Sequence, residues 1–285
     1  MTMFGSQWLA NAGASYEIDQ SIRFNDNDAA YLTRTPGSTG DRRTYTFSTW
    51  VKRGNLGLNT TFFGAGPSNE HVLRFQSNDT LHYYEYVGGF TFDLKTTQVF
   101  RDVSAWYHVV VSVDTDQATA ADRIKMYVNG SQVTSFTTAS YPSLNLDTIM
   151  NLTSSPTRVG WSGYSTQYFD GYMAENILID GQALAATDFG EYNDDGVWIP
   201  KAYTGAYGTN GFYITGATAG DLGEDFSGNN NDFTSSGLAA ASQGADSPTL
   251  NYCTLTPLSI AAFTGTFSEG NLRLAVTAND MQFGT

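Results

Sequence analysis

A strand–loop–hairpin run in the middle of the chain limits the available folds more than any other segment. Residues 107–114 read Tyr-His-Val-Val-Val-Ser-Val-Asp, so their side chains alternate between two faces of a β-strand. Residues 124–128 repeat this alternation after a polar loop. Asn129-Gly130 then supplies the two positive-φ residues that a type I′ hairpin turn requires. The run predicts antiparallel strands packed face to face, as in a β-sandwich.

Composition excludes several classes of partner. The 285 residues include 14 Lys and Arg against 28 acidic residues, which gives a formal net charge of −14. Nucleic acid and anionic membrane surfaces are bound mainly through cations, so neither is expected as a partner. The sequence has no basic and apolar signal peptide at its start, and no apolar run of the ~18 residues that a spanning helix needs. Cys253 is the single cysteine, so no internal disulfide is expected and we interpret it as a plain thiol.

Strand and turn signals divide the chain into three parts. Residues 1–15 are predicted to be an N-terminal arm, and residues 16–200 carry short strands separated by turns, as in an antiparallel sandwich. Residues 201–285 are rich in Gly, Asn and Ser, and are predicted to be a β-poor C-terminal extension that packs on the sandwich or on a neighbouring chain. We expect the two layers to enclose Trp50 and Trp106.

Several segments resemble laminin-G-like, concanavalin A-like lectin domains. They are the strand pair within residues 21–36, the strand Tyr-Thr-Phe-Ser-Thr-Trp-Val-Lys at 45–52, the strands and turn within 106–130, and Phe-Asp-Gly-Tyr-Met-Ala-Glu at 169–175. The order and spacing of these segments agree with that family over about two thirds of the chain. The resemblance implies an all-β, antiparallel jelly-roll sandwich.

The segments after residue 197 resemble a narrower group, the lectin-like structural proteins of tailed bacteriophages. The similar stretches are residues 198–201, 211–213, 225–233, 246–249 and 254–258. This resemblance implies a virion protein, either a head decoration, a head fibre or a tail-associated adhesin. It implies symmetric self-association, contacts with other virion proteins and attachment to host-surface glycans. The lack of a secretion signal agrees with a virion component that leaves its host by lysis.

The sequence patterns that would indicate catalysis are weak, and we expect no catalytic residues. A glycosidase needs two carboxyl groups flanking the scissile bond. The nearest pair on one strand is Glu175 and Asp180, whose odd spacing puts them on opposite faces. His71, His82 and His108 lack metal-ligand or triad spacing, and we interpret His108 as a hydrogen-bonded structural residue of the sheet.

Calcium is the one ion for which the sequence offers ligands. Asp225, Asn229 and Asp232 place oxygen atoms at short spacing, and residues 25–28 do the same. Neither run has the spacing of a known calcium loop, and Asx-rich turns also form without an ion. No other cofactor is expected.

Two aromatic segments are candidates for carbohydrate binding, because rings stack on apolar sugar faces while amides and carboxylates bind the hydroxyls. The first contains Trp161, Tyr164 and Tyr168, and the second Tyr84 and Tyr86. The same rings could instead pack in the core or form a protein–protein contact. The sequence therefore predicts a non-enzymatic virion protein with a lectin-like fold. The alternatives are a free calcium-dependent lectin and a glycoside hydrolase.

Overall fold

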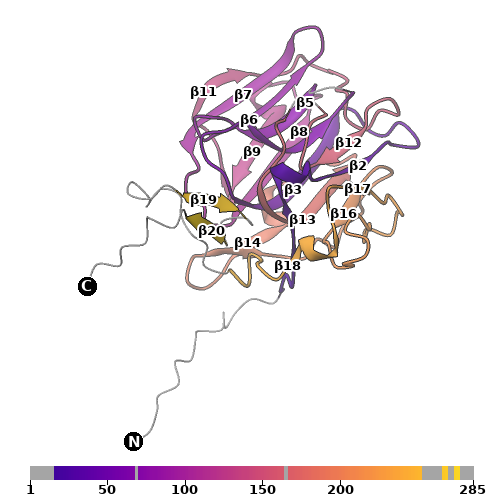
Figure 1. Ribbon diagram of the computed structural model, residues 1–285. Helices are drawn as coiled ribbons and strands as arrows, with labels where there is room; N and C mark the ends of the chain where they lie inside the picture. The colour runs from indigo at the N-terminus through magenta and orange to yellow at the C-terminus, as the bar shows by residue number, and fades with distance from the viewer. Residues whose placement is uncertain (1–15, 68–69, 164–165, 252–264, 269–272, 277–285) are drawn as a thin grey trace, which may run out of the picture.

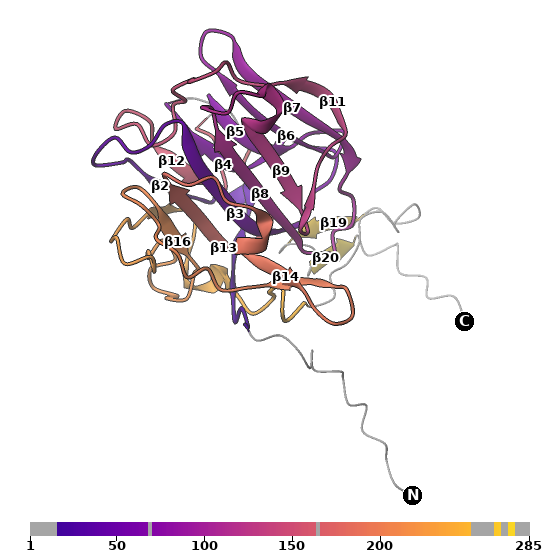
Figure 2. The same ribbon diagram turned by 180° about the vertical axis from the view of Figure 1, so that it is seen from behind.

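The computed structural model describes residues 16–67, 70–163, 166–251, 265–268 and 273–276. Two antiparallel eight-stranded sheets lie face to face as layers (Figures 1 and 2), which confirms the predicted all-β sandwich. Between the strands, the described residues contain only 3-10 turns, at Asp26–Asp28, Ala120–Asp122, Ala186–Asp188 and Ala240–Ser242. None of the described helical turns has the length and hydropathy needed to cross a membrane.

Sheet A contains the run that the sequence singled out. Its order is β10 (Ser131–Gln132), β9 (Ile124–Val128), β8 (Tyr107–Asp114), β3 (Thr44–Arg53), β13 (Gly171–Asp180), β1 (Ser21–Phe24) and β18 (Gln243–Gly244), with β16 (Phe212–Ile214) also paired to β13. Asn129 and Gly130 connect β9 to β10 with φ of 47° and 78°, so the predicted positive-φ turn is confirmed.

Sheet B forms the second layer. Its order is β11 (Phe136–Ser140), β7 (Phe90–Val99), β6 (Thr80–Tyr86), β5 (His71–Phe75), β4 (Thr60–Ala65), β12 (Thr157–Val159), β2 (Tyr31–Arg34) and β17 (Thr234–Ser236). Two small ribbons accompany the sheets: β14 (Gly190–Tyr192) with β15 (Trp198–Pro200), and β19 (Gly265–Ser268) with β20 (Arg273–Val276).

The core between the sheets follows the alternation of the strands. Val109, Val111 and Val113 of β8 point into it, and Phe47 of sheet A stacks on Phe63 of sheet B with ring centroids 3.8 Å apart. Burying such side chains stabilises the fold by roughly 1.5–3 kcal/mol each.

A second apolar cluster corrects the expected position of the tryptophans. Trp50 and Trp106 are buried, but they lie on the outer face of sheet A with Val110 and Trp198 rather than between the sheets. The reason is the period of two, because Val51 belongs to the inner core and its neighbour Trp50 must therefore face outward. The chain after β13 covers this outer face.

The described part of the predicted extension adds strands to both sheets. β16 and β18 join sheet A, and β17 pairs with β2 at the edge of sheet B. In both views the orange segment that carries β16 lies beside β13 and β2 (Figures 1 and 2). Residues up to 251 thus pack on the sandwich, while a domain division at residue 200 stays a prediction. The predicted arm at residues 1–15 and Cys253 lie outside the described residues.

Candidate functional site

Three aromatic rings gather on the outer face of sheet B, and we call them the aromatic platform: Tyr31, Trp161 and Tyr168. The Trp161 and Tyr168 rings stack with centroids 5.1 Å apart, and Tyr31 lies 4.8 Å from Trp161. All three side chains are partly exposed. The guanidinium carbon of Arg158 lies 5.4 Å from the Trp161 ring centroid. Two of the predicted sugar-binding rings therefore meet at one place.

Tyr31 is the platform residue that sequence reasoning missed. Its strand β2 is short, and Leu32 is fully buried in the core between the sheets. Alternation along β2 then puts Tyr31 on the outer face. The pattern contained this signal, but the neighbourhood with Trp161 depends on the folded loop after β12. Tyr164, the third ring predicted in that loop, lies outside the described residues.

A polar cavity of about 480 Å³ adjoins the platform at Tyr168. It is lined by Asp26, Asn27, Leu58, Asn59, Thr60, Thr166, Gln167 and Tyr168. Asp26 accepts a hydrogen bond on Oδ2 from Asn55 Nδ2 at 3.1 Å, whereas its buried Oδ1 has no hydrogen-bond partner among the described residues. Carboxylate, amide and hydroxyl groups next to a ring are the lining that binds sugar hydroxyls.

Tyr84 and Tyr86, the second predicted pair, differ in their exposure in the structure. Tyr86 is 47% exposed, but Tyr84 is only 4% exposed, and its ring stacks on His82 with centroids 4.4 Å apart. The guanidinium of Arg74 lies over the Tyr84 ring at 5.1 Å. Tyr84 therefore offers no open ring surface to a sugar in this structure, because its neighbours on the outer face of sheet B cover it.

Arg74 connects these two predicted segments. Its Nη1 donates to Gln167 Oε1 at 2.8 Å, and its Nε donates to His82 Nδ1 at 3.3 Å. Burial and the charge of Arg74 lower the pKa of His82 to about 3, so the ring is neutral near pH 7. The ring proton is then on Nε2, which donates to Asp93 Oδ1 at 2.7 Å. This network fixes Gln167, a wall of the polar cavity.

The predicted role of His108 is confirmed. Its Nε2 lies 2.9 Å from Ser48 Oγ, and Trp198 Nε1 donates to its Nδ1 at 3.0 Å. Burial lowers the pKa of His108 to about 3. The ring is a neutral structural residue on the outer face of sheet A, stacked on Trp50.

The predicted calcium ligands already have partners within the protein. Both oxygens of Asp225 accept hydrogen bonds, Oδ1 from the backbone N–H of Tyr213 and Oδ2 from that of Asn231. Asp232 Oδ1 accepts from the Asp225 N–H, and the Asn229 amide donates to backbone carbonyls. Across the described ranges, no three His, Cys, Asp or Glu side chains are grouped as a metal site. A calcium ion here stays a prediction.

The two residues of the candidate acid pair, Glu175 and Asp180, have different hydrogen-bond partners. Glu175 sits at a β-bulge in β13 with φ of 52°, and it accepts hydrogen bonds from the hydroxyls of Tyr16 at 2.9 Å and Tyr213 at 2.7 Å. Burial raises its pKa to about 7. Asp180 instead accepts from the backbone N–H groups of Asp41 and Asn210. The two carboxyls share no partner among these contacts.

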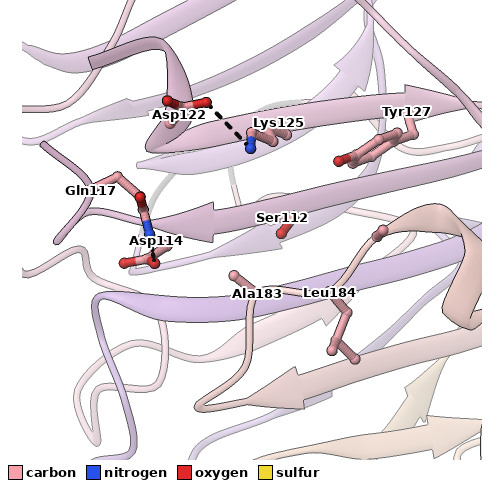
Figure 3. Close-up of a pocket in the computed structure, with 9 residues that line it drawn as sticks. Ser112, Asp114, Gln117, Asp122, Lys125, Tyr127, Ala183 and Leu184 are labelled. Carbon is pink, nitrogen blue, oxygen red and sulfur yellow. Dashed lines mark hydrogen bonds and ion pairs between the residues drawn. The ribbon is translucent and has the colours of Figure 1, made fainter. Parts of the chain in front are cut away.

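A smaller polar cavity of about 280 Å³ lies on the outer face of sheet A (Figure 3). Ser112 and Asp114 of β8, Lys125 and Tyr127 of β9, and the segment after β13 surround it. Asp122 pairs with Lys125 at 3.3 Å, and Asp114 accepts from Gln117 at 2.5 Å. Neither Glu175 nor Asp180 lines this cavity or the one beside the platform.

Solved structures with a similar fold include a putative carbohydrate binding protein from Bacteroides ovatus. It is 14% identical with a TM-score of 0.51, and the match covers 77% of this chain and 58% of that protein. A heptameric SAP-like pentraxin from Limulus polyphemus is 17% identical with a TM-score of 0.43, and the match covers 60% of this chain and 80% of the pentraxin. At these identities the likeness concerns the fold alone.

A further match is domain 4 of AbnA, an extracellular arabinanase from Geobacillus stearothermophilus, solved in complex with arabinotriose. It is 18% identical with a TM-score of 0.44, and the match covers 61% of this chain and 77% of that domain. None of the curated protein sequences matches this chain. The family model described as concanavalin A-like lectin/glucanases, of the laminin G type, matches residues 25–189, which is more than half of the chain. The protein therefore belongs to the concanavalin A-like lectin/glucanase superfamily.

Proposed function

We propose that this protein is a non-enzymatic glycan-binding protein of a bacteriophage particle, which it joins in several symmetric copies. The observation that carries the glycan-binding part is the aromatic platform beside the polar cavity. A pyranose ring can stack on Tyr168, the platform ring that lines the cavity, while its hydroxyls bond to Asn59, Thr166 or Gln167 in the cavity wall.

Asp26 adds a carboxylate to the cavity wall, and its Oδ2 accepts a hydrogen bond from Asn55. Carboxylates among the polar groups of a cavity can accept from sugar hydroxyls. The composition of the wall therefore supports sugar binding at this place.

The positions of Glu175 and Asp180, the candidate acid pair, support a binding role over hydrolysis. Glu175 is enclosed by Tyr16 and Tyr213, and Asp180 is held by backbone N–H groups. Neither carboxyl lines the cavity at the platform, where the sugar would lie.

The particle assignment rests on the resemblance of residues 198–258 to lectin-like phage proteins. The fold is compatible with this role, because residues 212–251 pair with strands of both sheets and leave the platform partly exposed. Immunogold labelling of purified particles tests the assignment, and labelling confined to the lysate supernatant would refute it.

A glycan array with purified protein tests the binding site. We expect binding that Tyr168→Ala reduces about fivefold or more, because a ring stacked on a bound ligand is worth on the order of 1–3 kcal/mol. Tyr192→Ala is the matched control, since Tyr192 is an exposed ring on β14, in the small ribbon that β14 forms with β15. Equal losses in the two variants would rule out the platform. Binding that disappears with EDTA would favour the calcium-dependent lectin, and release of reducing sugar would favour the hydrolase.

A further inference from the structure

A fully buried lysine lies against the carboxamide of a residue far away in the sequence. Lys52 of β3 has a side chain with 0% exposure, and its Nζ lies 2.8 Å from Asn251 Oδ1. The same Nζ lies 2.8 Å from Asp246 Oδ2, and the Asp246 side chain is 6% exposed. An amine, a carboxamide and a carboxylate thus meet at one atom.

Large side chains enclose Lys52, whereas Asn251 is exposed and lies at the rim of this contact. Tyr172 is the neighbour of Lys52 in the register of β13, and it is 2% exposed. Trp106, which is 8% exposed, lies beside Tyr172 and donates from Nε1 to Asp246 Oδ1 at 3.1 Å. Tyr172 and Trp106 belong to the second apolar cluster on the outer face of sheet A, and Lys52 faces the same side as Trp50 because two positions of β3 separate them.

Several independent contacts hold Asn251 and Asp246 in position. Asn251 Nδ2 donates to the Ser104 carbonyl at 3.0 Å, which turns its Oδ1 toward Lys52. The Asp246 carbonyl accepts from Ser21 Oγ at 2.6 Å, and β18 just before it pairs with β1. The Lys52 amine is therefore in direct hydrogen-bond contact with the carboxamide of Asn251.

We propose that Lys52 and Asn251 form an intramolecular isopeptide bond, with Asp246 as the general base. Asp246 takes a proton from the Lys52 ammonium, and the neutral amine attacks the Asn251 Cγ atom. The Cγ–Nδ2 bond then breaks, Asp246 returns its proton to the departing nitrogen, and this nitrogen leaves with the remaining amine proton as ammonium. One C–N bond forms and one breaks, no electrons are transferred, and Asp246 is regenerated.

The bond would tie β3 to the segment that covers the outer face of sheet A. The linked positions are 199 residues apart in the sequence. Cross-links across such distances restrict the unfolded chain. They also protect a surface adhesin, which bears mechanical load and is exposed to proteases. The proposal does not depend on glycan binding, because the platform lies on the opposite sheet.

Intact-mass measurement of the full-length protein tests the bond. We expect a mass below the sequence mass by one molecule of ammonia. In a tryptic digest, residues 44–53 should be linked to residues 202–273, since modified Lys52 resists cleavage. Lys52→Arg and Asp246→Asn should each restore the mass expected from their own sequences. Asn251→Asp should lose one molecule of water instead.

The matched control is Lys125→Arg, which alters another lysine with an acidic neighbour, Asp122, and should keep the ammonia deficit. Folded wild-type protein with the full sequence mass and separate peptides would overturn the proposal. A water deficit with Lys52 linked to the peptide at Asp246 would also overturn it, because the acid would then be the reacting group. Circular dichroism of each variant establishes that it is folded, and the Asn251→Asp result keeps the test decisive if Lys52→Arg does not fold.

Discussion

The buried carboxyl of Glu175 should make stability depend on pH with an unusual sign. Burial raises its pKa from 4.5 to about 7, against the lowering effect of the Tyr213 and Tyr16 hydroxyls. Between these two values the folded protein binds more protons at this site than the unfolded chain. The contribution of Glu175 to stability is therefore fully present below pH 4.5 and is lost as pH rises through about 7.

The size of the effect on stability follows from the pKa shift of Glu175. A change of one pKa unit corresponds to about 1.4 kcal/mol, so the full shift is worth about 3 kcal/mol. Moving from about pH 8 to about pH 5.5 should recover about 2 kcal/mol of it. Glu175→Gln keeps a carbonyl that can accept from a tyrosine hydroxyl but has no proton to bind, so its stability should lack this component.

Urea unfolding at both pH values measures the difference, as a cycle between wild type and variant. The cycle cancels the contributions of all other groups, because wild type and variant share them. Glu191→Gln is the matched control, because it removes an exposed carboxylate from β14. If wild type and Glu175→Gln gain the same stability on acidification, Glu175 does not take up a proton on folding and the reasoning fails.

Three further predictions follow from the same structure. Trp50→Ala and Trp106→Ala should each cost about 3–5 kcal/mol in urea unfolding, and variants that unfold like the parent would contradict the burial of these rings under the chain after β13. Gly171→Ala should cost about 1–3 kcal/mol, because φ is +145° and a Cβ would lie 2.1 Å from the Lys52 carbonyl oxygen, while Gly37→Ala, with open space around it, should be near neutral in the same thermal melt. The His108 ring should stay neutral in NMR titrations down to about pH 4, and the contribution of His108 to stability should fall as pH drops below 6.5, since the unfolded chain then binds a proton that the folded ring does not.

The aromatic platform shows how much of a site can be predicted from the sequence pattern alone. Trp161 and Tyr168 were predicted together because seven positions separate them in one loop. Tyr84 carried the same aromatic signal, yet it is covered by His82, two residues earlier on β6, and by Arg74 of the neighbouring strand β5. The contact with Arg74 is made across strands, and the sequence of β6 alone does not contain it.

The order of residues along the chain determined the strands, the Asn129-Gly130 turn and the inner face of β8, because alternation and turn chemistry are local properties. Only the tertiary structure decided that Trp50 and Trp106 face away from the core between the sheets, since that requires a later segment to cover them. It alone also brought Lys52 to Asn251, because side chains so far apart in sequence meet only after both sheets have paired.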